Sequence, residues 1–200
     1  MELGFYERYG VTALPLEPRA ILKRERIPVV DYPEYARKVG WPVEKLIEHY
    51  GRDAFTQCLD GRYLICCNSC LPRQRIRWTL THELCHIYLG HMEADSQAGD
   101  GADQEVDRLV SGALCPMPVV HLCGVASQSE LAALCGLSNE ASGYQFDRLQ
   151  RLRAQRSVLR TREDVQLVSR FLPFISGYIS EKLTGRTGID LWNYGGDTND

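Results

Sequence analysis

The sequence predicts a mostly helical α+β fold, in which a small β hairpin packs on one central helix and a helical segment follows toward the C-terminus. Two patterns predict this class. Apolar residues recur at helical spacing before and after residues 54–67, and within residues 54–67 two strand-like runs flank Asp60-Gly61. The 200 residues are 44% apolar and 24% charged, a composition typical of a globular protein with a core of its own.

The first third of the chain predicts a small helical layer. Its start is rich in proline and predicts no regular element before residue 32. Short helices are expected over 32–39 and 43–50, separated by Gly40-Trp41-Pro42. Gly51 follows the second helix, and glycine commonly ends a helix.

A β hairpin is expected next. Runs of β-prone residues cover 54–59 and 62–67, with Asp60-Gly61 between them. Asp-Gly readily adopts the positive φ angles that a two-residue hairpin turn needs. The two runs should therefore pair as antiparallel strands.

The central helix is predicted over residues 72–89. Its apolar residues form two stripes, so neighbouring elements should cover it on more than one side. The stripes contain Ile76, Leu80, Leu84 and Ile87, and Trp78, Cys85 and Leu89. A polar surface loop is expected over 92–102, followed by a helix over 103–114 that Pro116 and Pro118 end.

Three further helices are predicted over 130–135, 139–154 and 163–172, with Gly136 and Pro173 as breaks. The last seventeen residues, from Thr184, contain four glycines and few residues that could form a core. Such a composition is typical of a flexible tail.

The charge pattern excludes several classes of protein. A formal net charge of −3 is too small to attract the whole protein to nucleic acid or to anionic lipid. The N-terminus lacks the pattern of a secretory signal, and no run of about 18 apolar residues could form a membrane-spanning helix. We therefore expect a cytoplasmic protein with no membrane contact.

The eight cysteines do not predict a disulfide framework, because a chain of this size without an export signal does not need one. Cys67 and Cys70 have the spacing of a metal or redox pair, but no second pair accompanies them. We interpret both as reduced thiols, buried or at a strand end.

The predicted central helix carries an HExxH motif, His82-Glu83-Leu84-Cys85-His86. Residues four apart share one helix face, so both imidazoles can bind one Zn²⁺. Glu83 is rotated by about 100° around the helix axis, which keeps it off the metal and free to accept a proton from water. The pattern thus predicts His82 and His86 as zinc ligands and Glu83 as the general base.

The third ligand is less constrained by the sequence. A histidine six residues after the motif is excluded, because Met92 occupies that position. His91 follows a glycine at the helix end and is interpreted as a helix-capping residue. We favour Glu105, because an apolar stripe from Val106 to Ala113 would dock its helix on the zinc helix. The rivals are Glu93, Asp95 and Asp103.

Two histidines, one carboxylate and an open position are typical of catalytic zinc, and the expected reaction is amide hydrolysis. The group that stabilises the oxyanion is not determined by the sequence. Tyr88, Tyr144 and His121 are the candidates.

At this point the chain resembles the ImmA/IrrE family of metallopeptidases. Residues 76–91, IRWTLTHELCHIYLGH, are similar to the family pattern RxTLAHELGHxxLGH, and residues 105–116, EVDRLVSGALCP, to EANxFAxxLLMP. The chain departs from these patterns at Cys85, Val106, Leu109 and Cys115, none of which is an expected ligand. The resemblance covers about residues 75 to 150.

The resemblance implies a zincin-like fold, Glu105 as the third ligand, and a function in transcription regulation. Family members typically cleave or otherwise inactivate helix-turn-helix repressors of phages, mobile elements or stress responses. The expected function is therefore a zinc endopeptidase whose partner is such a repressor. The alternative is a non-proteolytic anti-repressor that contains zinc and acts by binding; a general digestive peptidase ranks third.

We expect three parts: a zincin-like metallopeptidase domain over 1–120, an accessory segment over 121–183 and the tail over 184–200. Residues 129–149 within the accessory segment resemble a helix-turn-helix, with Gly136-Leu137-Ser138 as the turn. An arginine-rich run follows, and given the small negative net charge we expect it to serve packing or a protein partner rather than DNA. The run contains Arg148, Arg151, Arg153, Arg156, Arg160 and Arg162.

Overall fold

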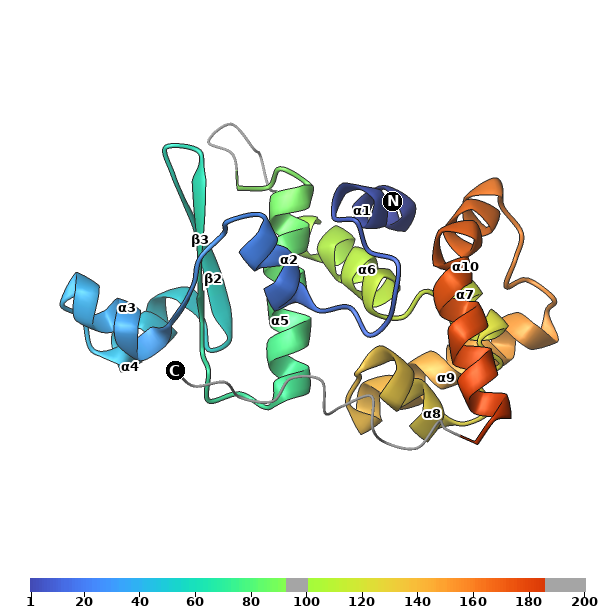
Figure 1. The fold of residues 1–200 in the computed structure, drawn as a ribbon. Coiled ribbons are helices and arrows are strands. Elements are labelled where there is room, and N and C mark those ends of the chain that lie inside the picture. Colours follow the sequence, from blue (N-terminus) through green and yellow to red (C-terminus); the bar gives the residue numbers. More distant parts are fainter. Residues whose placement is uncertain (93–100, 186–200) are drawn as a thin grey trace.

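The computed structural model describes residues 1–92 and 101–185 and confirms the expected α+β class, mostly helical with a small sheet (Figure 1). In these ranges the elements follow one another as α1 (Glu2–Arg8), α2 (Pro18–Arg24), β1 (Val29–Asp31), α3 (Tyr32–Val39), α4 (Val43–Tyr50), β2 (Ala54–Leu59), β3 (Arg62–Cys67), α5 (Arg73–Tyr88), α6 (Ala102–Leu114), α7 (Met117–Leu122), α8 (Gln128–Cys135), α9 (Asn139–Ala154) and α10 (Arg162–Leu183).

The sheet has three strands in the order β1-β3-β2, with β1 parallel and β2 antiparallel to β3. Asp60 and Gly61, between β2 and β3, have φ angles of 51° and 71°. Two positive φ angles are what a type I′ hairpin turn requires. The Asp60-Gly61 hairpin prediction is therefore confirmed.

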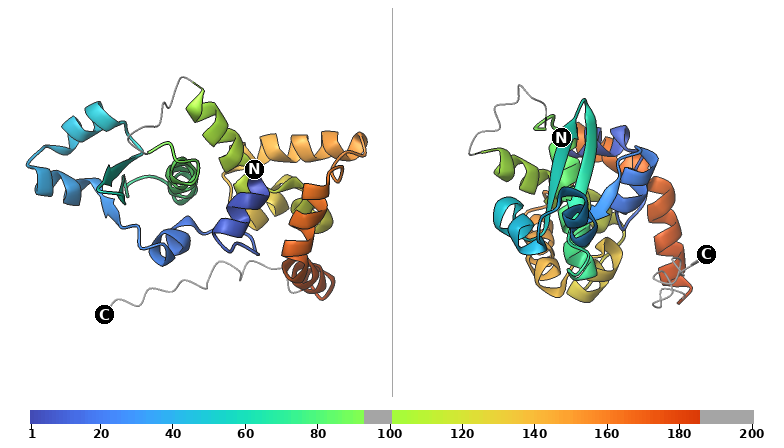
Figure 2. Two further views of the ribbon diagram at one scale, coloured as in Figure 1. Left: turned by 90° about the horizontal axis from the view of Figure 1, so that it is seen from above. Right: turned by 90° about the vertical axis from the view of Figure 1, so that its left-hand side faces the viewer.

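Helix α5 occupies the middle of the molecule. It packs against β2 and β3 on one side and against α6 and α2 on others, and Leu80, Leu84 and Cys85 are completely buried. Figure 2 shows the layers: α3 and α4 lie on the side of the sheet away from α5. The predicted central helix is thus covered on several sides, as its two apolar stripes indicated.

The N-terminal segment contains regular structure that the sequence did not predict. Helix α1 buries Phe5 and Tyr6 completely, and the Tyr6 hydroxyl donates a hydrogen bond to the Ala113 carbonyl at 2.8 Å. Helices of seven residues are not stable alone, so their local signal is weak and tertiary contacts hold them. The three-residue strand β1 likewise depends on pairing with β3, far along the chain.

One proline prediction is confirmed and one needs correction. Helix α6 ends at Leu114 before Pro116, as expected, and Pro118 lies in the first turn of α7, where the N–H that proline lacks would have no helical partner. Pro173 does not end a helix, since α10 continues through it to Leu183. Pro173 and Ser169, whose carbonyl loses its helical partner, are both exposed, so water can solvate that carbonyl.

The main hydrophobic core runs from α1 to α10, so residues on both sides of position 120 share it. The Tyr6 and Phe171 rings, for example, pack edge-on with centroids 5.1 Å apart. A second, smaller cluster lies between α3, α4 and the sheet. Within residues 1–92 and 101–185, no helix is both long and apolar enough to cross a membrane.

Candidate metal centre

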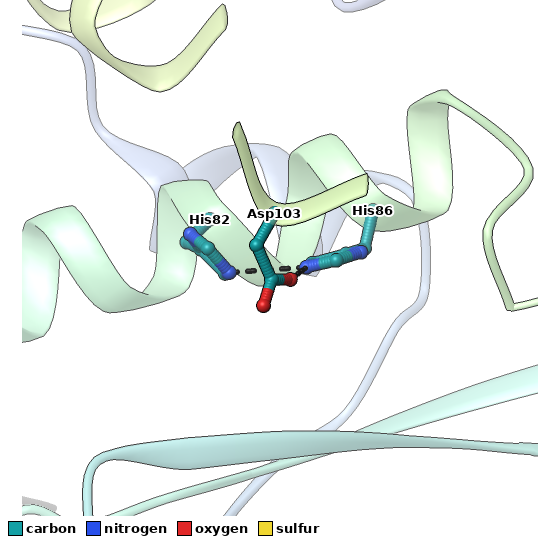
Figure 3. A group of neighbouring side chains, drawn as sticks. All are labelled: His82, His86 and Asp103. Atoms are coloured by element: carbon teal, nitrogen blue, oxygen red, sulfur yellow. Dashed lines mark hydrogen bonds and ion pairs between the residues drawn. The ribbon is translucent and has the colours of Figure 1, made fainter. Parts of the chain in front are cut away.

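His82 and His86 lie one turn apart on α5, and their Nε2 atoms approach each other to 3.0 Å. Both side chains are partly buried. Figure 3 shows the two rings converging on one point, which α6 crosses. The two predicted histidine ligands therefore present their nitrogens to a common position.

Asp103, in the first turn of α6, lies at the same point. Its Oδ1 is 3.5 Å from His86 Nε2, and Figure 3 shows its carboxylate between the two rings. Ligand atoms of His82, His86 and Asp103 all lie within 4.8 Å of one another. Among the described residues, these three form the group of His, Cys, Asp and Glu side chains suited to hold one metal ion.

Two nitrogens and an oxygen form a donor set of the kind that zinc accepts. Zinc bonds to nitrogen and oxygen of about 2.0–2.2 Å place neighbouring donors roughly 3.3–3.6 Å apart. Of the three separations, that between His86 Nε2 and Asp103 Oδ1, 3.5 Å, lies in this range, and that between the two Nε2 atoms, 3.0 Å, is slightly shorter. Burial, with a contribution from His82, lowers the pKa of His86 to about 4, so His86 is neutral at pH 7, as a ligand must be.

Glu105, the ligand that the sequence favours, lies elsewhere. Its Oε2 is 3.8 Å from His91 Nε2, and His91 Nδ1 is 3.3 Å from His86 Nδ1. Glu105 thus reaches the far side of His86 through His91. Its role as a ligand stays a prediction, and of its rivals Glu93 and Asp95 lie outside the described residues.

Helix geometry explains why Asp103 and Glu105 point in different directions. Asp103 and Asp107 are four residues apart and share one face of α6, whereas Glu105 is rotated from Asp103 by about 200°. Asp107 Oδ1 lies 3.2 Å from His82 Nδ1. A carboxylate on Nδ1 fixes the tautomer that offers Nε2 to a metal. The sequence interpretation missed Asp107, although its spacing from Asp103 was a usable signal.

Glu83 is buried beside the centre and points toward the sheet rather than into the group of ligand atoms. Its Oε2 accepts a hydrogen bond of 2.6 Å from the Thr56 hydroxyl on β2. Burial raises the pKa of Glu83, and the bond from Thr56 and the nearby His82 oppose this shift. A carboxylate with a raised pKa in a fixed orientation has the properties of a general base.

Two of the three candidates for stabilising an oxyanion have other contacts, and the third is exposed. The Tyr88 ring packs edge-on against Phe5, with centroids 5.5 Å apart. Arg153 Nε donates to His121 Nδ1 at 3.2 Å. Tyr144 lies on α9 and is 70% exposed. These contacts give no support to any of the three.

The predicted helix-turn-helix has the expected helices and turn. Gly136 ends α8 with φ at 63°, and the Ser138 side chain caps α9. The N-terminal half of α9 faces α6, because Gln145 Nε2 donates to Ser111 Oγ at 2.8 Å. A DNA-reading helix exposes this half to base edges. The observed contact is consistent with the expected packing role.

Cys67 is buried at the end of β3 and Cys70 is exposed, both as free thiols.

Comparisons with known proteins give no relative: no family model, curated protein or solved structure matches the chain. The interpretation of the centre therefore depends on its own residues and their geometry.

Proposed function

We propose that this protein is a cytoplasmic, zinc-dependent endopeptidase with a zincin-like fold. One observation carries the proposal: His82, His86 and Asp103 converge on one position, and the buried Glu83 lies beside it without joining them. His82 and His86 supply two ligands in this proposal. Asp103 is the third ligand that the geometry favours, and Glu105 is the one that the sequence favours.

Zinc, when bound, supplies a Lewis acid that polarises a carbonyl group and makes water a better nucleophile. Glu83 accepts a proton from the attacking water and then donates it to the leaving amine. Thr56 orients the Glu83 carboxylate through its hydrogen bond. Asp107 holds the His82 ring in the orientation that keeps Nε2 directed at the metal position.

The position of Thr56 also supports a peptide substrate. Thr56 lies on β2, and among the described strands β2 pairs with β3 alone. An extended peptide can add to such a strand edge through main-chain hydrogen bonds. A peptide paired there would lie beside Glu83.

The substrate class follows from the resemblance to the ImmA/IrrE family. A helix-turn-helix repressor of a phage, mobile element or stress response is the proposed partner. The alternative is a zinc-containing anti-repressor that only binds. Glu83 favours the enzyme, because a structural zinc site has no need of a buried carboxylate held in place beside its ligands.

The test is to incubate the purified protein with helix-turn-helix repressors encoded near it, with and without a metal chelator. Cleavage on a gel that the chelator abolishes supports the peptidase. Glu48→Gln, which changes an exposed glutamate on α4, should cleave like the wild type. Loss of repressor activity without any cleavage would favour the binding protein instead.

A further inference from the structure

Two cysteines outside the metal centre lie in direct contact with each other. The Cys135 thiol donates a hydrogen bond to the Cys115 sulfur, at a sulfur–sulfur distance of 3.7 Å. Both are free thiols in this structure. A disulfide bond is about 2.05 Å long, so the two sulfur atoms must approach each other by about 1.7 Å to form one.

Both cysteines lie at helix ends, where the backbone can adjust to such an approach. Cys115 directly follows α6 and has φ and ψ angles of −140° and 72°, outside the helical region. Cys135 is the last residue of α8, and Gly136 follows it in the left-handed conformation. Residues inside a helix are held by hydrogen bonds on both sides, whereas residues at its end are not. The pair can therefore close without breaking a helix.

A cavity brings small solutes close to the pair. Its volume is about 490 Å³, and it is bounded by α5, by the end of α6 with Cys115, and by the turn that begins at Gly136. Cys115 is only 1% exposed and Cys135 is completely buried. A peroxide, which is little larger than water, therefore reaches Cys115 only when the cavity wall fluctuates. Oxidation of the pair should accordingly be slow.

The surroundings of the pair give the two thiols different roles. The hydrogen bond to Cys115 and burial raise the pKa of Cys135, and the nearby Arg77 opposes this shift. Arg77 is itself buried, and its guanidinium group donates to the Gly136 carbonyl at 2.9 Å. Cys135 therefore keeps its proton. Cys115, which borders the cavity, is the sulfur that an oxidant meets first.

We propose that Cys115 and Cys135 form a reversible oxidation site, at which hydrogen peroxide converts the two thiols to a disulfide bond. Cys115 first attacks the peroxide: the O–O bond breaks, Cys115 becomes a sulfenic acid, and the second oxygen leaves as water with the thiol proton. Cys135 then attacks the sulfenic sulfur: the S–S bond forms, the S–O bond breaks, and the hydroxyl group leaves as water with the Cys135 proton. Two thiols are oxidised, and one peroxide is reduced to two waters.

The disulfide bond ties the end of α6 to the accessory helix α8. A crosslink between residues that are 20 positions apart restricts the unfolded chain, and it should raise the melting temperature by roughly 5–10 °C. Disulfide bonds in a reducing compartment are usually transient, so the bond should form under peroxide and be lost again to a dithiol.

The test uses the full chain with Cys58→Ser and Cys70→Ser, because these two exposed cysteines could otherwise form intermolecular disulfide bonds. Hydrogen peroxide at about 1 mM is added with a chelator, which prevents metal-catalysed oxidation, and the reaction is followed over minutes to hours. The intact mass should fall by that of two hydrogens, the melting temperature should rise as stated, and dithiothreitol should reverse both changes. Neither measurement depends on peptidase activity, so this proposal and the proposed function can fail independently.

Peptide mapping locates the bond. Cleavage after Glu130 separates Cys135 from Cys115 and Cys123, so the disulfide should appear as two peptides that stay joined until reduction. The variants Cys115→Ala and Cys135→Ala should each lose the joined peptides and the rise in melting temperature. Cys123→Ala changes another buried cysteine near Cys135 and should keep both.

Three results would overturn the proposal. One is oxidation to sulfinic acid at these cysteines without joined peptides. The second is a joined pair that persists in Cys115→Ala, because Cys123 would then be the partner. The third is a disulfide bond that forms only in denaturant. If the two alanine variants do not fold, mapping of Cys123→Ala decides alone, because only Cys115 remains on its side of Glu130.

Discussion

The third ligand of the proposed zinc site can be identified by comparing Asp103→Asn with Glu105→Gln. Both changes remove one negative charge at nearly constant size. Asp103 Oδ1 lies 3.5 Å from His86 Nε2, whereas Glu105 reaches only His91, at 3.8 Å. We expect Asp103→Asn to weaken zinc binding far more than Glu105→Gln.

The magnitudes follow from the two positions. Structural sites with four ligands bind zinc with about 10–16 kcal/mol, or roughly 2.5–4 kcal/mol per ligand. Loss of a direct ligand should therefore weaken binding by roughly 10²–10³-fold. Loss of a residue that only supports a ligand typically costs about 10–100-fold. Glu105 acts on His86 through His91, so its loss should fall at the lower end of that second range.

The assay is competition for zinc with a chromophoric chelator, with elemental analysis of the same preparations. The wild type should hold about one zinc per chain, and His86→Ala should hold none. The zinc affinity of Asp107→Asn should fall between those of the two test variants, because Asp107 supports His82. The zinc affinity of Asp147→Asn, which changes an exposed residue, should match that of the wild type. A larger loss with Glu105→Gln than with Asp103→Asn would refute this reasoning and support the ligand that the sequence favours.

Three further outcomes are expected. Glu83→Gln should keep zinc bound while repressor cleavage falls by about 10²–10⁴-fold, and unchanged cleavage by the zinc-loaded variant would exclude Glu83 as the base. We expect no specific DNA-binding site on this protein, so changing Arg151 and Arg153 to Ala should not alter specific DNA binding. A salt-dependent, specific DNA site that this change abolishes in a binding assay would contradict the prediction. Glu130 should stabilise the fold at pH values above the usual glutamate pKa of about 4.3. Burial raises the pKa of Glu130, but hydrogen bonds from the Ala126 N–H and from Lys182 outweigh this effect and lower the pKa. Because the folded state then binds fewer protons than the unfolded state, this stability should be lost as the pH falls through the lowered pKa, and Glu130→Gln should reduce the fall in melting temperature between pH 7 and pH 3.

Local sequence signals predicted the elements whose stability has a local source. The observed bounds of α3, α4, β2 and β3 equal those expected, because glycines, prolines and the Asp60-Gly61 turn define their ends. The 16 residues of α5 carry enough apolar residues to define a helix without knowledge of their neighbours. In contrast, α1, α2 and β1 are short and depend on distant segments, so their own residues gave no clear signal.

In the candidate site too, some residues could be predicted from local spacing and others depend on how distant segments pack. His82, Glu83 and His86 lie within one turn of a single helix, so their spacing alone fixes how they are related. The carboxylate comes from another helix, and its identity depends on how α6 is rotated against α5. The Asp107 contact with His82 and the Glu105 contact with His91 depend on that rotation as well.

Sequence alone could not fix this rotation, because the apolar stripe of α6 is wide enough to accommodate both acidic residues. Val106 and Val110 follow Asp103 by three and seven residues, while Leu109 follows Glu105 by four, so either residue can begin the stripe. The rotation is fixed in part by α1, whose Tyr6 hydroxyl donates to the Gly112 and Ala113 carbonyls. A Cβ atom on Gly112 would lie only 2.0 Å from a carboxylate oxygen of Glu2, so a larger residue there would require the Glu2 side chain to move. Gly112 follows Glu105 by seven residues and lies on the same face, which places α1 along that face and leaves the Asp103 face toward the two histidines. The choice between the two candidate ligands thus depends in part on a helix that the sequence did not predict.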